Sequence, residues 1–202
     1  EGMVCIATSE LDAIYRMPEI AARVQLQEPG IELEFVVSND VSDLKRRDAD
    51  IALRSFRPDQ SDLIARRLRE ERICLYASSS YLASLEYSRG PEDCLIAQFI
   101  GYNRTDQFRN ALTTQGWQED AIKFPFITSF QLMHVEMAKR GMGFTLLPDD
   151  VAEQIPELEQ AFTNKGPFMT LDLWLVTHRE LHTNPRVRRV FDIMVDVLAE
   201  PV

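Results

Sequence analysis

The stretch IELEFVVSNDVSDLKRRDADIALR, residues 31–54, contains two apolar runs separated by a polar segment. Its beginning, IELEFVV, alternates apolar with acidic residues and then becomes fully apolar, which is typical of a β-strand. Its end, DIALR, is a second short strand, and Val41–Arg47 is long enough for one short helix between them. A strand, a helix and a strand in this order are typical of a parallel sheet with helical crossovers.

The residues before this stretch repeat the same alternation. Met3–Ala7 is a short apolar strand, and a helical pattern follows it. Pro18 is tolerated only near the first turn of a helix, so we expect the regular helix to begin close to it. The pair Pro29-Gly30 ends that helix. The first part of the chain is therefore predicted to be an α/β lobe with a parallel sheet.

Downstream, the chain is predicted to leave this first sheet and to form a second α/β half. Two strands are expected close together, at 63–68 and 72–77, because there is no room for a helix between them. Strands at 96–102 and 123–128 follow, each succeeded by a helix. The last of these helices carries an apolar stripe at helical spacing, which consists of Phe130, Met133, Met137 and Ala138.

A glycine-framed turn and a final helix complete the pattern. Gly141 and Gly143 allow a left-handed turn into the strand FTLL, which Pro148 ends. Near the end of the chain, LDLWLVTH is a strand, and Asn184-Pro185 opens a helix. Its apolar stripe is expected to pack back on the first half, so that the chain crosses twice between the halves; it consists of Val187, Val190, Phe191, Met194, Val195 and Leu198.

Composition limits the classes of function. The chain has 202 residues, of which 45% are hydrophobic, and its formal net charge of −10 comes from 32 acidic and 22 basic residues. Such a surface repels phosphate backbones, so this segment is a poor candidate for binding nucleic acid. No apolar run is long enough to cross a membrane, and the beginning EGMVCIATSE has no signal-peptide pattern. A cytoplasmic location fits best, although a processed N-terminus would look similar.

No motif for catalysis or metal binding is present. The three cysteines have no metal spacing, and the order HRELH at His178 and His182 differs from the zinc-protease motif. His134 lies in an apolar helix and is expected to be a packing residue. We therefore expect no enzyme, no metal and no cofactor.

Several segments, in the same order and at similar spacing, resemble the effector-binding domain of LysR-type transcriptional regulators. They are PGIELEFVV, DADIALR, LIARRLREERICLYASSSYL, MAKRGMGFTLLP and LWLVTHRELHTNPRVRRVFDIM. The resemblance implies the fold of type 2 periplasmic binding proteins: two Rossmann-like lobes with a cleft and two crossover hinges. It implies a first lobe of residues 1–71 and 179–202, and a second lobe of residues 72–178. The family's N-terminal winged helix-turn-helix is absent from this sequence.

The resemblance also implies partners. The domain would bind a small-molecule effector, a carboxylate or another anion, and would dimerise head to tail, giving a tetramer in the full-length protein. The helix and strand of the first lobe would meet their counterparts in the second lobe of the partner. DNA would be bound only through the absent domain, and no membrane is involved.

The expected ligand sites follow from the carboxyl ends of the strands, where helix N-termini offer free N–H groups to an anion. The candidate ligand-binding residues are Thr8, Ser9, Arg54, Ser55, Asn103, Thr128 and Ser129. Arg104 is a weaker candidate than Asn103, because its longer side chain turns more easily to solvent. The serines and threonines could instead be ordinary helix caps, and Arg54 could be an ordinary surface arginine.

Two alternatives remain open from the sequence. A periplasmic solute-binding protein for a small anion would have the same fold, with an export signal upstream. An enzyme on this fold would need a catalytic acid, base or nucleophile in the cleft, which the sequence does not offer. Neither the effector nor the choice between activation and repression follows from the sequence.

Overall fold

The computed structural model describes residues 2–39, 49–58, 61–85 and 90–199. The helix expected at Val41–Arg47 lies outside these residues. The chain divides into two compact units: unit 1 comprises Glu1–Glu71 with Leu171–Val202, and unit 2 comprises Arg72–Thr170. It passes from one unit to the other within two strands, β4 (Leu63–Ser78) and β9 (Met169–His178).

The second of these divisions differs from the prediction, which placed it after His178. The units divide between Thr170 and Leu171, inside β9. The physical reason is that Leu173 and Leu175 of β9 are fully buried in the hydrophobic core of unit 1. Most of β9 therefore belongs to the first unit, and the strand itself carries the crossing.

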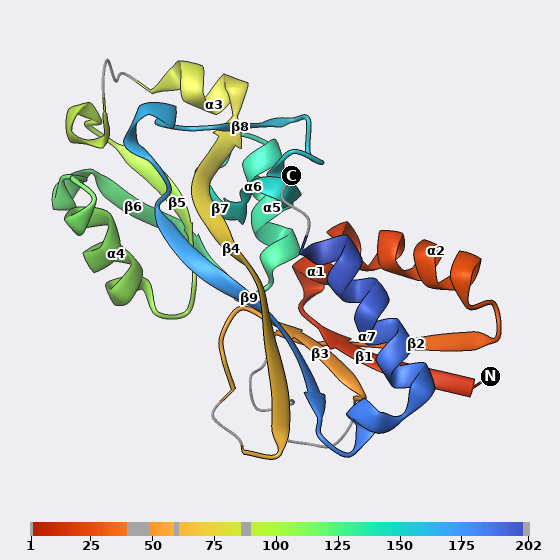
Figure 1. Cartoon of the computed structure of the whole chain (residues 1–202). Helices are drawn as coiled ribbons and strands as arrows, with labels where there is room; N and C mark the ends of the chain where they lie inside the picture. Colours follow the sequence, from red (N-terminus) through yellow and green to blue (C-terminus); the bar gives the residue numbers. More distant parts are fainter. Residues whose placement is uncertain (1, 40–48, 59–60, 86–89, 200–202) are drawn as a thin grey trace. The chain divides into compact units, whose positions relative to one another are not determined.

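Unit 1 contains a mainly parallel sheet (Figure 1). Strand β1 (Gly2–Thr8) pairs in parallel with β2 (Ile31–Val37) and with β3 (Ile51–Arg54), and β3 pairs antiparallel with β9. The strand order is therefore β2-β1-β3-β9. These strands were predicted, and the parallel pairs confirm the α/β class.

Among the residues described in this unit, three helices accompany the sheet: α1 (Glu10–Tyr15), α2 (Met17–Gln27) and α7 (Pro185–Leu198). Pro18 lies in the first turn of α2, as predicted, whereas the separate helix α1 was not expected. At the start of α7, the Asn184 side chain accepts a hydrogen bond from the Arg186 N–H at 3.1 Å. This cap and Pro185 together explain why the helix begins there.

Helix α7 closes the core of unit 1. All six residues of its predicted stripe are buried, and they join a cluster with residues of β1, α2, β3 and β9. Burying an aliphatic side chain of this size contributes roughly 1.5–3 kcal/mol. The prediction that the last helix packs back on the first half of the chain is confirmed.

Unit 2 is built on two groups of strands. β5 (Ala97–Gly101) pairs in parallel with β6 (Ile122–Ile127), while β7 (Thr145–Pro148) and β8 (Leu158–Gln160) pair antiparallel with β4. Its helices are α3 (Ser79–Ser84), α4 (Thr105–Thr114), α5 (Gln131–Lys139) and α6 (Asp149–Ala152). Short 3-10 turns of the chain lie at Pro91–Asp93, Glu119–Ala121, Thr163–Lys165 and Leu181–Thr183.

An aromatic cluster forms the core of unit 2. The Phe99 ring packs edge-on against Trp117 at 4.9 Å between centroids, and Trp117 packs edge-on against Phe162 at 5.3 Å. Phe144 of the segment before β7 lies 5.3 Å from Phe99. Edge-to-face pairs of this kind contribute about 0.5–1.5 kcal/mol beyond the area they bury.

Strand β4 corrects one prediction. The two expected strands at 63–68 and 72–77 are one continuous strand of 16 residues. The charged residues between them do not interrupt it, because Glu71 is buried and forms ion pairs with Arg16 and Arg69. A charged residue is compatible with a strand when its side chain forms ion pairs with neighbouring side chains.

Helix α5 and its turn were predicted in part. Gly141 and Gly143 have φ values of +75° and +137°, as the left-handed turn requires. The predicted apolar stripe is wrong at Phe130 and Met133, which are 47% and 43% exposed. The buried face of α5 instead carries His134, Val135 and Ala138, because the helix packs against β5 and β7 with that side.

Two further findings concern the chain as a whole. No helix among the described residues is long and apolar enough to cross a bilayer. In the described part of the chain, the three cysteines form no disulfide; Cys74 and Cys94 are buried, and Cys5 is partly buried.

Candidate functional site

In unit 1, four of the predicted site residues lie at the carboxyl ends of neighbouring strands. The parallel pairing of β1 with β3 sets Ile6 beside Ile51 and Ala7 beside Ala52. The same register, continued for two residues, sets Ser9 beside Arg54. Thr8, Ser9, Arg54 and Ser55 therefore share one edge of the sheet, as the sequence predicted.

The hydroxyl groups of Thr8 and Ser9 have different environments. Thr8 is 0% exposed, and its Oγ1 has no hydrogen-bond partner among the described residues. Ser9 caps α1: its Oγ accepts from the Asp12 N–H at 3.1 Å and donates to the Asp12 carboxylate at 2.8 Å. Because α1 has only six residues and Ser9 caps it, this helix end has little left to offer an anion.

Arg54 is a partly buried cation without an ion-pair partner in the described part of the chain. One of its Nη atoms donates to the Leu53 carbonyl at 2.9 Å, and its buried Nε has no partner there. Burial lowers the pKa of Arg54 from 12.5 to about 10, and the nearby Asp12 carboxylate opposes this shift. The guanidinium remains charged at neutral pH and has donors free for a carboxylate. Ser55, the next residue, is exposed.

A buried ion network is linked to this edge through Ser9, and it was not predicted from the sequence. Arg16 donates to Asp12 at 2.7 Å and to Glu71 at 2.5 Å, and all three residues are at most 6% exposed. Asp12 thus accepts from both Ser9 and Arg16. The network joins Ser9, a predicted ligand residue, to the last residue of unit 1 on β4.

In unit 2, the other three predicted residues also lie together. The parallel pairing of β5 with β6 sets Gly101 beside Ile127, and the Thr128 N–H donates to the Gly101 carbonyl at 2.9 Å. The register, continued, sets Asn103 beside Ser129. Asn103 and Ser129 are exposed, and Thr128 is partly buried.

Thr128 and Ser129 do not cap α5 as ordinary N-caps. The N-cap is Phe130, which makes no side-chain cap bond, and the Thr128 Oγ1 accepts from the Phe130 N–H at 3.1 Å. Thr128 therefore shapes the turn before the helix. For Thr128, the bond to the Phe130 N–H is a local turn contact and not a bond from the N-cap residue itself.

The side chain of His134 contacts this turn, and the ring of Tyr102 packs against His134. The Nε2 of His134 lies 2.7 Å from the Thr128 carbonyl oxygen, and its ring stacks on Tyr102 at 4.4 Å. Because a carbonyl oxygen only accepts, Nε2 carries the proton. Burial lowers the pKa of His134 and raises that of Tyr102 to about 12, so both side chains are neutral at physiological pH. His134 is 1% exposed, in agreement with a packing role.

The other histidines do not form a metal site among the residues described. No group of three potential ligands occurs there. His178 lies 3.7 Å from Asp62, and His182 packs edge-on against Phe191 at 5.5 Å. Arg104, the weaker candidate, is exposed.

Comparison with known proteins decides the family. The family model described as the LysR substrate binding domain matches residues 1–199. The chain belongs to this family. The resemblance inferred from the sequence is therefore confirmed, and a periplasmic solute-binding protein is not favoured.

Similar proteins from bacteria support this assignment. The HTH-type transcriptional regulator CrgA of Neisseria meningitidis serogroup B is 27% identical over 98% of this chain, which covers 68% of that protein. The Mau operon transcriptional activator of Paracoccus denitrificans is 27% identical over 94% of this chain, which covers 64% of that protein. The chain thus spans about two thirds of the length of these regulators.

Solved structures confirm the fold. The regulatory domain of CrgA from Neisseria meningitidis has a TM-score of 0.84 at 24% identity and is covered over 99% of its length, with 98% of this chain. The regulatory domain of CcmR from Synechocystis PCC6803, in complex with 2-PG, has a TM-score of 0.77 at 14% identity, with 98% of each chain covered. The chain is an effector-sensing domain of the LysR type, and these relatives are regulators rather than enzymes.

Proposed function

We propose that the effector of this domain is a small carboxylate and that Arg54 is its charge partner. The observation that carries the proposal is the guanidinium of Arg54, which is partly buried, cationic and without an ion-pair partner in the described ranges. A planar guanidinium binds a carboxylate through two parallel hydrogen bonds, which fixes orientation as well as charge. An ordinary surface arginine would be exposed and would lose little on substitution.

The other predicted ligand residues form two groups, one in each unit. Ser9 and Ser55 lie on the Arg54 edge of unit 1, and Asn103, Thr128 and Ser129 lie together in unit 2. That one ligand touches residues of both units stays a prediction. Under this proposal the effector favours one conformation of the regulator over another, and DNA is bound by a further domain in the cytoplasm.

A screen by thermal unfolding tests the proposal. A ligand that binds only the folded state raises the melting temperature, by an amount that grows with its concentration above Kd. We expect small carboxylates to raise the melting temperature of the domain and the corresponding neutral amides to leave it unchanged. Equal effects of acids and amides, or no effect of any acid, would contradict the charge argument.

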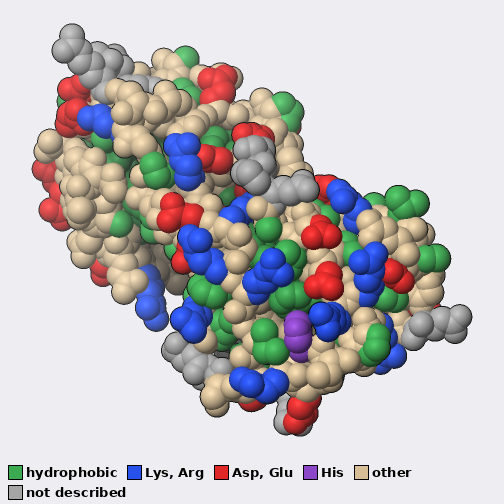
Figure 2. Space-filling model, in the orientation of Figure 1, with side chains coloured by type: hydrophobic (Ala, Val, Ile, Leu, Met, Phe, Trp, Pro, Cys, Tyr) green, Lys and Arg blue, Asp and Glu red, His purple; other side chains and the backbone are tan. Residues whose placement is uncertain are grey.

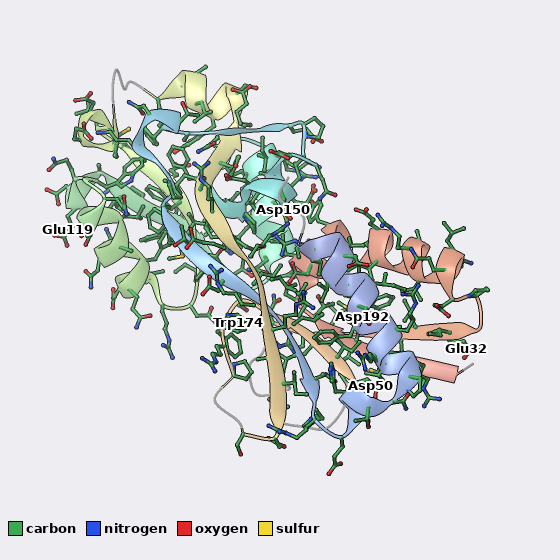
Figure 3. The ribbon with its side chains drawn as sticks, viewed as in Figure 1. Glu32, Asp50, Glu119, Asp150, Trp174 and Asp192 are labelled. Carbon is green, nitrogen blue, oxygen red and sulfur yellow. The ribbon has the colours of Figure 1, made fainter. Side chains whose placement is uncertain are left out.

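We further propose that the domain forms a head-to-tail homodimer and that the full-length regulator is a tetramer. Strand β2 is at an edge of its sheet, and Glu32 and Glu34 on it are exposed; Glu32 is labelled in Figure 3. Strand β6 pairs only with β5 among the described strands, and its exposed side chains are Lys123, Pro125 and Ile127. Lys123 on β6 of one copy and the two glutamates on β2 of another are opposite in charge.

A further inference from the structure

Arg54 has an aromatic neighbour on the adjacent strand. In the antiparallel pairing of β3 with β9, Arg54 lies directly opposite Trp174, which Figure 3 labels. Directly opposite residues of an antiparallel pair point to the same face of the sheet, with Cβ atoms roughly 4.5–5.5 Å apart. Arg54 and Trp174 are therefore neighbours on one face of the β3–β9 pair.

Arg54 and Trp174 lie on the face of the unit 1 sheet that is opposite to the hydrophobic core. Leu53 and Leu175 form the preceding pair of the ladder, and both are buried against α2 and α7. Because side chains alternate along a strand, Arg54 and Trp174 point away from that core. Both residues are partly exposed.

The position of Arg57 indicates that the indole of Trp174 can bind a flat, charged group. Its guanidinium carbon lies 5.7 Å from the centre of the Trp174 ring, near the outer limit of a cation–π contact. Arg57 is exposed, and such contacts contribute only about 0.5–1 kcal/mol, so a ligand can displace it. Phe56, beside it, is 41% exposed and adds a second aromatic side chain to the same loop.

We propose that Arg54 and Trp174 form a subsite for an aromatic carboxylate, whose carboxylate pairs with Arg54 while its ring lies against the indole. The proposal rests on the proposed function, because it names the class of carboxylate that Arg54 would bind. In a short aromatic acid such as benzoate, the acidic group and the ring are coplanar neighbours. Arg54 and Trp174 are paired residues of neighbouring strands, so a ligand that binds one of them lies close to the other.

Fluorescence of the 202-residue chain tests this subsite directly. The chain has two tryptophans, and Trp117 is 3% exposed in the core of unit 2, so a contact at Trp174 is read as the difference from a Trp174→Phe variant. The probes are benzoate, cyclohexanecarboxylate, which keeps size and charge without aromaticity, and benzamide, which keeps the ring without charge. Calorimetry gives the affinities of the same probes.

We expect benzoate to change the Trp174 emission saturably and to bind about two- to tenfold more tightly than cyclohexanecarboxylate, the range of an aromatic pair. Benzamide should bind at least about tenfold more weakly than benzoate, because it lacks the charge. Trp174→Leu should remove the preference for benzoate without weakening cyclohexanecarboxylate. Arg54→Ala should weaken both acids, and Arg66→Ala, an exposed arginine of β4, should weaken neither.

Two results would overturn the subsite, and they are distinguishable. Equal affinities for both acids, or a Trp174→Leu variant that keeps the preference, would remove the aromatic subsite and leave the carboxylate function intact. Failure of both acids to bind would overturn the subsite, and undiminished binding of both by the Arg54→Ala variant would overturn the proposed function together with the subsite.

Discussion

Thr8 presents a polar group that costs stability in the structure as it stands. Its side chain is fully buried, and its hydroxyl has no partner among the residues described. An unpaired buried hydroxyl costs about 1–3 kcal/mol. We expect Thr8→Val to leave the free energy of unfolding unchanged or to raise it by about 1 kcal/mol, measured by urea denaturation. A loss of more than about 1 kcal/mol would show that the hydroxyl is hydrogen-bonded.

The candidate ligand residues could be identified from the sequence, but the residues next to them in the fold could not. Thr8, Ser9, Arg54 and Thr128 were identified because each follows a strand, which is a local pattern. Asp12, Arg16 and Trp174 were missed, since their roles depend on Glu71 and Arg54, which are far away in the chain. No periodicity or motif records such pairs.

Among the elements, the junction of α1 and α2 depends on one buried cation. Arg16 stands between the two helices and pairs with Asp12 and Glu71. Removing one partner from a buried ion network leaves uncompensated charge and costs about 3–5 kcal/mol. We therefore expect Arg16→Ala to lower the free energy of unfolding by this amount, measured by denaturation.

Arg23→Ala in α2 is the matched control for this substitution. Arg23 and Glu19 are 3.6 Å apart, and their side chains are 40% and 67% exposed. Exposed pairs contribute about 0–1 kcal/mol. Equal effects of the two substitutions would contradict the importance of burial at Arg16.

The turn from α5 to β7 contains a glycine, Gly143, that lies close to the backbone of a neighbouring strand. Gly143 has φ +137°, and a Cβ there would lie 2.6 Å from the Gln98 carbonyl oxygen. Gly166 has φ +79°, but a Cβ there would meet no atom within 4 Å. Both Ala substitutions add backbone strain of about 1–3 kcal/mol, and Gly143→Ala adds a clash with backbone. The melting temperature should fall further for Gly143→Ala; a larger fall for Gly166→Ala would refute the close approach.

Element order was predictable and element boundaries were less so. The alternation of strands and helices follows from local hydrophobic periodicity, which the chain displays clearly in residues 31–37 and 185–198. The sequence predicted two strands in place of the single strand β4, because its side chains change from partly exposed to fully buried along its length. The stripe of α5 was misassigned because its neighbours β5 and β7, rather than its own periodicity, decide which side is buried.

For the whole molecule, charge distribution bears on assembly. The net charge is −10, and Figure 2 shows acidic and basic side chains interspersed on the face it displays. We expect Glu34→Lys, on the edge strand β2, to weaken the proposed homodimer by like-charge repulsion with a basic partner edge. Sedimentation at increasing concentration measures this, with Glu180→Lys, at an exposed turn, as the control. A wild-type chain that remains monomeric at high concentration would contradict the homodimer.

We infer that this LysR-type domain senses a small carboxylate through Arg54. Calorimetry of an acid that raises the melting temperature, on the wild-type chain and on the Arg54→Ala variant, tests it most directly. We expect the Arg54→Ala variant to lose about 2–5 kcal/mol in binding free energy, which includes leaving the ligand's charge unpaired. Unfolding of the variant should hardly change, since Arg54 has no ion-pair partner within the described ranges. Unchanged affinity of the variant would contradict the claim.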